Sequence, residues 1–99
     1  MPPFVNGVFR LIVRWLDLAL RDFEEAMQDI AQTNPEAARD VAQKIWEGTQ
    51  RLARHPDQGR IGRVSATREL VISGTSYIVP YRIAGDCVQI LRTVYVYVL

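Results

Sequence analysis

The first half of the chain carries apolar residues at the spacing of helices. Between residues 17 and 32 an apolar side chain recurs every three or four positions, as on the buried face of an amphipathic helix. The members of this stripe are Leu16, Ala19, Leu20, Phe23, Ala26, Met27 and Ile30. Acidic residues lie opposite the stripe. The pattern predicts a first helix over residues 17–32.

A second helix is predicted from residue 35 to about residue 54. Asn34 can accept hydrogen bonds from the free N–H groups of a first turn, and Pro35 suits the first helical position. The helix ends before Pro56, because the residue before a proline disfavours the helical conformation. Trp46 sits beside the apolar stripe, where it either packs on the edge of the core or meets a partner. Since a short turn joins the helices, they form an antiparallel hairpin.

The second half changes to the two-residue period of strands. It predicts strands over residues 68–72, 77–83 and 87 to about 97, after a turn-rich loop over residues 56–67. Gly85-Asp86 closes a two-residue hairpin that sets Ile83 opposite Val88 and Tyr81 opposite Ile90. Pro80 has no N–H to donate, so its strand needs a bulge or an unpaired side there.

The alternation also assigns the two faces of this sheet. The face that covers the helices contains Val79, Tyr81, Ile83, Val88, Ile90, Val94 and Val96. The other face contains Ile78, Arg82, Gln89, Leu91, Thr93 and Tyr95. Residues 94–99 are apolar on both faces, and an exposed apolar strand favours pairing with another chain. We therefore expect a partner to cover this surface.

The predicted fold is α+β. A short N-terminal strand over residues 9–13, after a loose arm over residues 1–8, precedes the antiparallel helical hairpin and a three-stranded antiparallel sheet. The length of 99 residues fits a single domain over residues 1–99. No apolar run reaches the roughly 18 residues of a membrane span, so we expect no membrane partner. A single cysteine rules out an internal disulfide and fits a reducing cytoplasm, where we expect the protein.

Composition narrows the chemistry. Cys87 is the only cysteine and His55 the only histidine, which leaves almost nothing for a zinc site or a Ser-His-Asp triad. We expect no metal and no cofactor. The net charge of +1 does not indicate a large sequence-independent nucleic-acid footprint. The cations are eleven arginines and a single lysine, Lys44, and arginine binds carboxylate or phosphate as a fork.

Several arginines are candidate binding residues. Arg60 and Arg63 lie among glycines in the predicted loop, where functional residues are frequent. Arg82 and Arg92 lie in apolar strands, so each needs a carboxylate, a backbone carbonyl or a ligand. The sequence leaves open whether that partner is internal or belongs to another molecule. Arg68 beside Glu69 fits an exposed ion pair at a strand edge.

Motifs across residues 10–95 resemble those of the RelE/ParE superfamily of bacterial toxins. The similar segments are Asn34-Pro35-Glu36-Ala37-Ala38, Leu52 with Pro56 and Gly59-Arg60-Ile61-Gly62, Thr67-Arg68-Glu69-Leu70, Tyr77-Ile78-Val79-Pro80-Tyr81-Arg82 and Ile90-Leu91-Arg92. The resemblance departs at the C-terminal end. Tyr95 stands where relatives usually have a histidine, and an apolar run replaces a polar tail.

The resemblance implies two alternative activities. The RelE-like branch is a ribosome-dependent endoribonuclease that cleaves mRNA, with Arg60, Arg63, Arg82 or Arg92 as phosphate-holding cations and Tyr95 or Tyr81 as the acid–base group. The ParE-like branch is not an enzyme and inhibits DNA gyrase. The Gly59–Arg82 stretch looks closer to the ParE-like branch, so we expect a gyrase-inhibiting toxin, with an inactive antitoxin-binding copy as a third alternative.

The resemblance also implies a cognate antitoxin protein that wraps the toxin and places a helix in an apolar groove. The candidate residues for binding the antitoxin or the target are Trp46, Arg60, Arg63, Arg68, Arg82, Leu91, Tyr95 and Tyr97.

Overall fold

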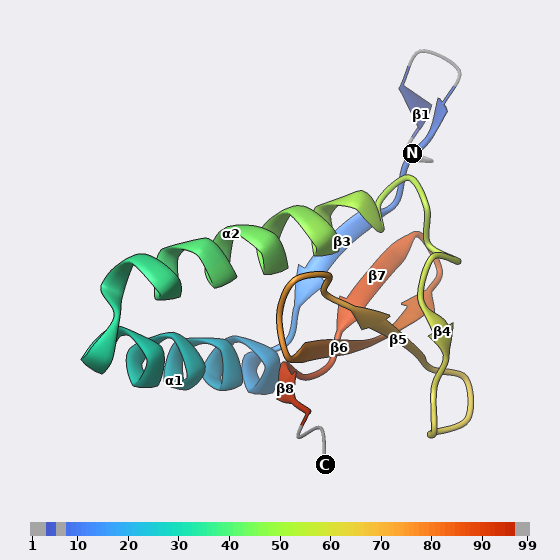
Figure 1. Ribbon diagram of the computed structural model, residues 1–99. Helices are drawn as coiled ribbons and strands as arrows, with labels where there is room; N and C mark the ends of the chain where they lie inside the picture. Colours follow the sequence, from blue (N-terminus) through green and yellow to red (C-terminus); the bar gives the residue numbers. More distant parts are fainter. Residues whose placement is uncertain (1–3, 6–7, 97–99) are drawn as a thin grey trace.

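Two helices pack on one face of a mixed β-sheet in the computed structural model of the chain (Figure 1). The structure describes residues 4–5 and 8–96, with side chains from Arg10 to Val96. The helices are α1 (Asp17–Thr33) and α2 (Pro35–Arg51). The strands are β1 (Phe4–Val5), β2 (Val8–Phe9), β3 (Ile12–Trp15), β4 (Arg60–Ile61), β5 (Arg68–Val71), β6 (Tyr77–Ala84), β7 (Cys87–Ile90) and β8 (Val94–Tyr95).

The helical hairpin follows the prediction closely. The side chain of Asn34 accepts a hydrogen bond of 3.0 Å from the N–H of Ala37, and Pro35 opens α2. The helix ends three residues earlier than predicted, because the N–H groups of Leu52, Ala53 and Arg54 bond to carbonyls three residues back. Such bonds tighten the last turn and close the regular α-helix.

The sheet has the strand order β3-β7-β6-β5-β4. The predicted hairpin register is confirmed, with Tyr81 opposite Ile90 and Ile83 opposite Val88. Gly85 begins the turn with a φ of +60°, a conformation that suits glycine in a two-residue hairpin. Strand β3 pairs in parallel with β7, so the sheet is mixed rather than purely antiparallel. Strand β4 was not predicted, because the sequence indicated a loop over that segment.

The N-terminal strand of the sheet begins later in the chain than predicted. Phe9 belongs to β2, which pairs with β1, and the strand that joins the sheet begins at Ile12. Two apolar pairs flank Asn6-Gly7 in the sequence, which is a strong hairpin signal that the prediction of a loose arm overlooked. Residues 1–3 and 6–7 of that predicted arm lie outside the described residues.

The predicted third strand is interrupted after Ile90. Tyr81 pairs with Ile90 and Tyr77 with Tyr95, so four steps along β6 oppose five steps along the other segment. One extra residue in a strand is a β-bulge, and it moves the following side chains to the opposite face. The carbonyl of Pro80 accepts from the N–H of Leu91 at this bulge. The bulge that the proline predicted therefore lies on the strand opposite it.

The bulge corrects the predicted faces. Thr93 is buried, and its hydroxyl donates to the carbonyl of Ala19 on α1, so it lies on the helix side rather than the outer side. Val94 is exposed instead. Val79, Tyr81, Val88 and Ile90 are fully buried as predicted. Ile83 is 42% exposed, because it lies at the end of β6 beyond the core under the helices.

Candidate functional site

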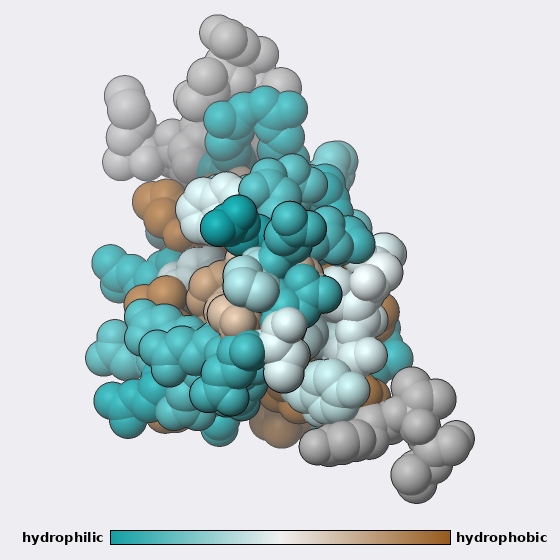
Figure 2. All heavy atoms as spheres, turned by 60° about the vertical axis from the view of Figure 1, so that its left-hand side comes forward, coloured by the Kyte–Doolittle hydropathy of each residue, from teal (hydrophilic) through white to brown (hydrophobic). Residues whose placement is uncertain are grey.

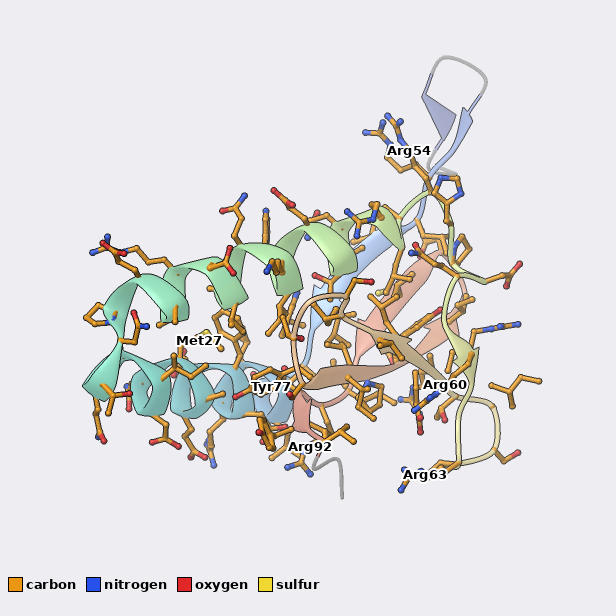
Figure 3. All side chains as sticks on the ribbon, viewed as in Figure 1. Met27, Arg54, Arg60, Arg63, Tyr77 and Arg92 are labelled. Atoms are coloured by element: carbon orange, nitrogen blue, oxygen red, sulfur yellow. The ribbon has the colours of Figure 1, made fainter. Side chains whose placement is uncertain are left out.

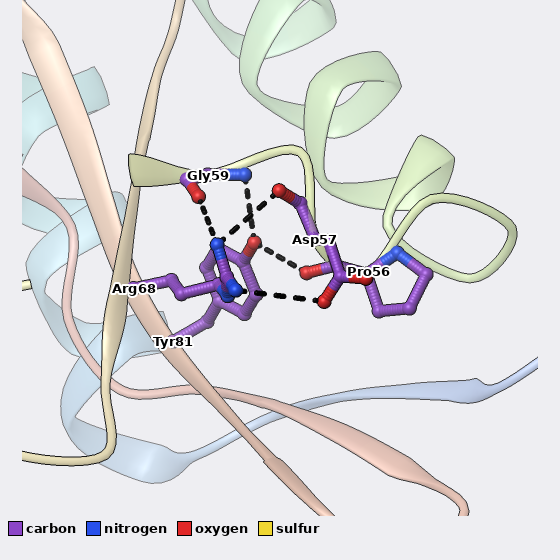
Figure 4. Close-up of polar contacts among 5 residues, drawn as sticks. All are labelled: Pro56, Asp57, Gly59, Arg68 and Tyr81. Atoms are coloured by element: carbon purple, nitrogen blue, oxygen red, sulfur yellow. Dashed lines mark hydrogen bonds and ion pairs between the residues drawn. The ribbon is translucent and has the colours of Figure 1, made fainter. Parts of the chain in front are cut away.

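A buried tyrosine anchors the loop between α2 and β4 (Figure 4). The hydroxyl of Tyr81 donates to the carbonyl of Pro56 at 2.6 Å and accepts from the N–H of Gly59 at 2.9 Å. Burial raises the pKa of Tyr81, although the bond from Gly59 acts in the opposite direction. The side chain is fully buried and its hydroxyl is engaged on both sides. Tyr81 therefore has a structural role, and its engaged hydroxyl disfavours it as the acid–base group.

Arg68 holds the same loop from the other side. Its Nη1 donates to the carbonyl of Gly59 at 2.8 Å and to that of Asp57 at 3.3 Å (Figure 4). Its Nη2 lies 3.7 Å from Oδ1 of Asp57. The sequence placed this arginine in an ion pair at a strand edge with Glu69, and the structure corrects the partner. Half-buried Arg68 thus fixes the backbone that leads into β4.

Glu69 is a buried carboxylate that organises the following loop. Its Oε1 accepts from Nε and Nη2 of Arg60 at 3.2 and 3.1 Å, and its Oε2 accepts from the backbone N–H of Arg63 at 3.3 Å. The bond from Arg63 and then the guanidinium of Arg60 lower the pKa of Glu69 against the opposing effect of burial. The side chain of Arg63 is exposed and forms no ion pair within residues 10–96.

Exposed apolar side chains gather next to these arginines. Ile61 is 84% exposed and Val64 69% exposed, and both lie in or after β4. A hollow of about 290 Å³ lies beside Ile61, and its other walls include Arg68, Arg82 and Ile83. We call the surface formed by Ile61, Arg63, Val64, Arg82 and Ile83 the β4–β6 surface.

The apolar members of the β4–β6 surface were missed by sequence reasoning. Ile61 and Val64 lie in a segment that was predicted as a loop, so their side chains were assigned to neither face of the sheet. Ile83 was assigned to the core by alternation alone. The signal that could have revealed this surface is the presence of apolar residues among the glycines of a turn-rich segment. On the outer side, Arg82 donates from Nε to the neutral side chain of Gln89 at 2.6 Å.

Arg92 and Tyr95 lie at the other end of the sheet, beside α1. Arg92 forms a fork on Asp22, with Nε–Oδ2 and Nη2–Oδ1 distances of 2.6 and 3.0 Å. The N–H of Thr93 donates to the same carboxylate at 3.1 Å. These contacts, with Arg92 first, lower the pKa of Asp22. The partner that Arg92 needs is therefore internal.

Tyr95 packs edge-to-face on Tyr77, with ring centres 5.4 Å apart. The rings border a hollow of about 370 Å³ whose other walls include Asp22, Glu25 and Asp29. The nuclease candidates therefore form two groups, with Arg92 and Tyr95 apart from Arg60, Arg63 and Arg82. Figure 3 shows Arg60 and Arg63 on one side of the molecule and Arg92 on another. Tyr77, the partner of Tyr95, is five residues from Arg82 along β6, which is about 16 Å of strand.

The remaining candidates occupy separate places. Trp46 is 54% exposed on α2, and Leu91 is half-buried at the bulge. Tyr97 lies outside the described residues. Neither helix of the described chain is long and apolar enough to cross a membrane. Within the same residues, no three His, Cys, Asp or Glu side chains are grouped to hold a metal ion.

Comparison with known sequences identifies toxins as relatives. A family model described as the ParE toxin of the type II toxin–antitoxin system parDE matches residues 13–95. The protein Y4kP of Sinorhizobium fredii, whose name classes it with toxins, is 41% identical over 83 residues, or 84% of this chain and 85% of that protein. Toxin RelE2 of Caulobacter vibrioides is 32% identical over 80 residues, or 81% of this chain and 89% of that protein.

Solved structures show the same relationship. A chain of the chromosomal ParDE system of P. aeruginosa superimposes with a TM-score of 0.82 at 26% identity, covering 89% of this chain and 98% of that one. A chain of the toxin–antitoxin complex RelBE2 of Mycobacterium tuberculosis gives a TM-score of 0.59 at 25% identity, covering 88% of this chain and 99% of that one.

Proposed function

Because the chain belongs to the ParE toxin family of type II toxin–antitoxin systems, we propose that it stops bacterial growth by inhibiting DNA gyrase. In this proposal a cognate antitoxin protein neutralises it in the cytoplasm. The chain acts by binding its target and not by catalysis.

The separation of Arg92 and Tyr95 from the other nuclease candidates is the observation that carries this proposal. Cleavage of RNA requires cations around one phosphate and an acid–base group within hydrogen-bond reach of the reacting atoms. Here Tyr95 borders a hollow with three carboxylates, and Asp22 neutralises Arg92. A phosphate at this place would meet negative charge. The likeness to RelE2 and to the RelBE2 complex keeps the ribosome-dependent nuclease as the competing function.

The β4–β6 surface is our candidate for the gyrase contact. It combines exposed Ile61, Val64 and Ile83 with the cations of Arg63 and Arg82. Arginine and well-packed apolar anchors contribute most of the binding energy in protein interfaces. The loop is also held in place, since Glu69 binds both Arg60 and the backbone of Arg63.

The antitoxin is placed elsewhere in this proposal. Trp46 projects from α2 with half of its surface exposed, and the ParDE and RelBE2 relatives belong to toxin–antitoxin systems. We expect the antitoxin to cover Trp46 and the outer face of the sheet around Leu91. Separate surfaces for target and antitoxin would allow the antitoxin to bind while the β4–β6 surface is still free.

Induced expression of the full chain in a bacterium tests the function. Incorporation of labelled thymidine and labelled methionine is followed after induction. We expect DNA synthesis to stop first, with filamentous cells and undegraded mRNA. An early stop in translation with cleaved mRNA would instead establish the nuclease. Unaffected growth from a soluble product would identify an inactive copy.

A further inference from the structure

The net charge of +1 conceals a strong separation of charge along the molecule. Residues 17–40, which form α1 and the start of α2, contain seven acidic side chains and two arginines. Residues 10–16 and 48–96, which include the sheet, contain nine arginines and three acidic side chains. Figure 1 shows the helical hairpin pointing away from the sheet, and Figure 2 shows that this forward-turned end is largely hydrophilic.

This separation is long enough for the two ends to act independently. The molecule measures 45 Å along its longest axis. Charges in physiological salt are screened beyond about 8 Å. A charged partner at the sheet end therefore responds to the local arginines and not to the net charge of the chain.

Two adjoining hollows gather arginines where α2 ends. The first, of about 470 Å³, is lined by Arg10, Leu11, Val13, Gln50, Arg51, Ala53 and Arg54. The second, of about 590 Å³, is lined by Arg51, Arg54, His55, Pro56, Asp57 and Gln58. Arg51 and Arg54 line both, so the hollows form a continuous basic surface. Arg54 projects beyond the end of α2 in Figure 3. We call Arg10, Arg51 and Arg54 the arginine triad.

No ion pair balances the charge of the triad among the described side chains, although Glu47, one helical turn before Arg51, lines a neighbouring hollow with it. None of its guanidinium groups forms an ion pair with the side chains described from Arg10 to Val96. Nε of Arg10 is buried and has no hydrogen-bond partner among them. Asp57 is the one carboxylate in these linings, and it faces Arg68 at 3.7 Å. Cations near the C-terminus of a helix interact favourably with the helix dipole. This interaction accounts for the positions of Arg51 and Arg54 but not for that of Arg10, beside β3.

The backbone fixes the position of the triad. The N–H of Leu11 donates to the carbonyl of Ala53 at 2.7 Å, which ties the segment before β3 to the end of α2. Arg10 and Arg54 each lie next to one of these two residues in sequence. Their Cα positions are therefore set by a backbone hydrogen bond and not by a mobile loop. Arginines carried on neighbouring, fixed backbone positions can converge on one phosphate, whose oxygens match the guanidinium fork.

We propose that the arginine triad binds the phosphodiester backbone of duplex DNA. The lining contains no Phe, Tyr or Trp among the described side chains, and such rings are the usual stacking platforms for single-stranded nucleic acid. It also contains none of the large exposed apolar residues that would anchor a protein partner. A double-stranded backbone requires neither. The inference rests on the proposed function, because gyrase holds duplex DNA and a toxin docked on it would lie close to that DNA.

Fluorescence anisotropy with a labelled duplex of mixed sequence tests the proposal. The purified full chain is titrated between about 50 and 200 mM KCl. Three phosphate contacts give a slope of roughly −2.7 for the logarithm of affinity against the logarithm of salt concentration, or a loss of roughly 40-fold over this range. Arg51→Gln with Arg54→Gln should reduce the slope by about 1.8.

The matched control removes two arginines from the acidic end. Arg21→Gln with Arg39→Gln changes the net charge by the same amount and should leave the slope unchanged. Equal effects of the two double variants would overturn the proposal, because net charge alone would then explain binding. Tighter binding of single-stranded RNA or of poly-glutamate than of the duplex would overturn it as well. The melting curve of each variant verifies that it is folded.

A separate supercoiling assay with purified gyrase distinguishes this inference from the proposed function. Inhibition of gyrase by a chain that does not bind duplex DNA at about 50 mM KCl would refute the DNA contact alone. Triad-dependent DNA binding by a chain that leaves gyrase active would refute gyrase inhibition and support the DNA contact.

Discussion

The hydroxyl of Tyr81 lies 2.9 Å from the backbone nitrogen of Gly59, although 22 residues separate the two in the chain. Together with the bond to Pro56 this contact sets the path of the chain from α2 into β4. The β4–β6 surface and the second basic hollow both border that path. The stability of the fold and both proposed binding surfaces therefore depend on the same tyrosine.

Replacement of Tyr81 by phenylalanine should destabilise the fold by about 1–3 kcal/mol, because it leaves the buried N–H of Gly59 and the part-buried carbonyl of Pro56 without their partner. Urea denaturation followed by tryptophan fluorescence measures the change. Tyr95→Phe is the matched control, since that side chain is half exposed. Similar losses in both variants would show that the buried bonds of Tyr81 contribute little.

Gly59→Ala should also destabilise, for a steric reason. A Cβ at this position would lie 2.6 Å from Cε1 and 2.7 Å from the hydroxyl oxygen of Tyr81, and that ring is fully buried and cannot move aside. Crowding of this kind costs about 1–3 kcal/mol. Gly85→Asn is the control, because nothing lies within 4 Å of its Cβ position and asparagine tolerates the positive φ. An unchanged melting temperature for Gly59→Ala would contradict the close approach.

Acid should weaken the fold through Asp22. Arg92 and then the N–H of Thr93 hold its pKa below the ordinary value of 3.8, so the unfolded chain takes up a proton at higher pH than the folded chain does. The stabilisation from this carboxylate is present above pH 3.8 and is lost as the pH falls through the lowered pKa. The lowered pKa of Glu69, whose ordinary value is 4.5, acts with the same sign.

Urea midpoints measured from about pH 6 to about pH 3 test this dependence. Asp22→Asn should be less stable than the unmodified chain at about pH 6 and should lose less on acidification. Glu24→Gln, on the exposed surface of α1, should decline in parallel with the unmodified chain. A profile for Asp22→Asn that also runs parallel would show that the fork between Asp22 and Arg92 does not contribute to stability.

Loss of the apolar anchors should abolish target binding while the fold persists. Ile61→Glu with Val64→Glu should weaken inhibition of gyrase supercoiling by about tenfold or more, as expected for residues at the centre of an interface. Val71→Glu adds charge at another half-exposed apolar position, outside the β4–β6 surface, and should have little effect. Equal inhibition by all three proteins would place the gyrase contact elsewhere.

Trp46→Ala should reduce co-purification of the cognate antitoxin. Because the indole is 54% exposed, the cost in folding should stay well below the roughly 3–5 kcal/mol of a buried aromatic deletion. Arg39→Ala, exposed two turns earlier on α2, should retain the antitoxin. Undiminished binding by the Trp46 variant would remove α2 from the antitoxin surface.

The sequence was sufficient for the elements with regular periods. Asn34 and Pro35 marked the start of α2, and Gly85 set the register of β6 and β7. The predicted faces of the sheet were wrong where one extra residue lies between Ile90 and Tyr95, because the two-residue period of a strand does not reveal a bulge. Pro80 indicated that some irregularity was required but not on which strand it would lie. Thr93 and Tyr95 consequently changed faces.

The charged candidates were less predictable, because their partners are distant in sequence. Arg92 and Asp22 are 70 residues apart, and only the pairing of β3 with β7 brings the start of α1 next to the end of the sheet. Arg68 and Glu69 are neighbours in sequence but point to opposite faces of β5, and so they bind different partners. Adjacent charges on a strand cannot be paired by proximity alone.

The parallel pairing of β3 with β7 has a consequence for synthesis of the protein. Strand β7 lies between β3 and β6 and supplies fully buried Val88 and Ile90, yet it follows all of its sheet neighbours in the chain. As the polypeptide leaves the ribosome, β3 and the helices are made before the strand that completes their core. Long-range strand pairing of this kind forms slowly. A nascent toxin therefore cannot complete its fold until β7, which ends at Ile90, has left the ribosome. That delay gives an antitoxin time to meet the chain before it is folded.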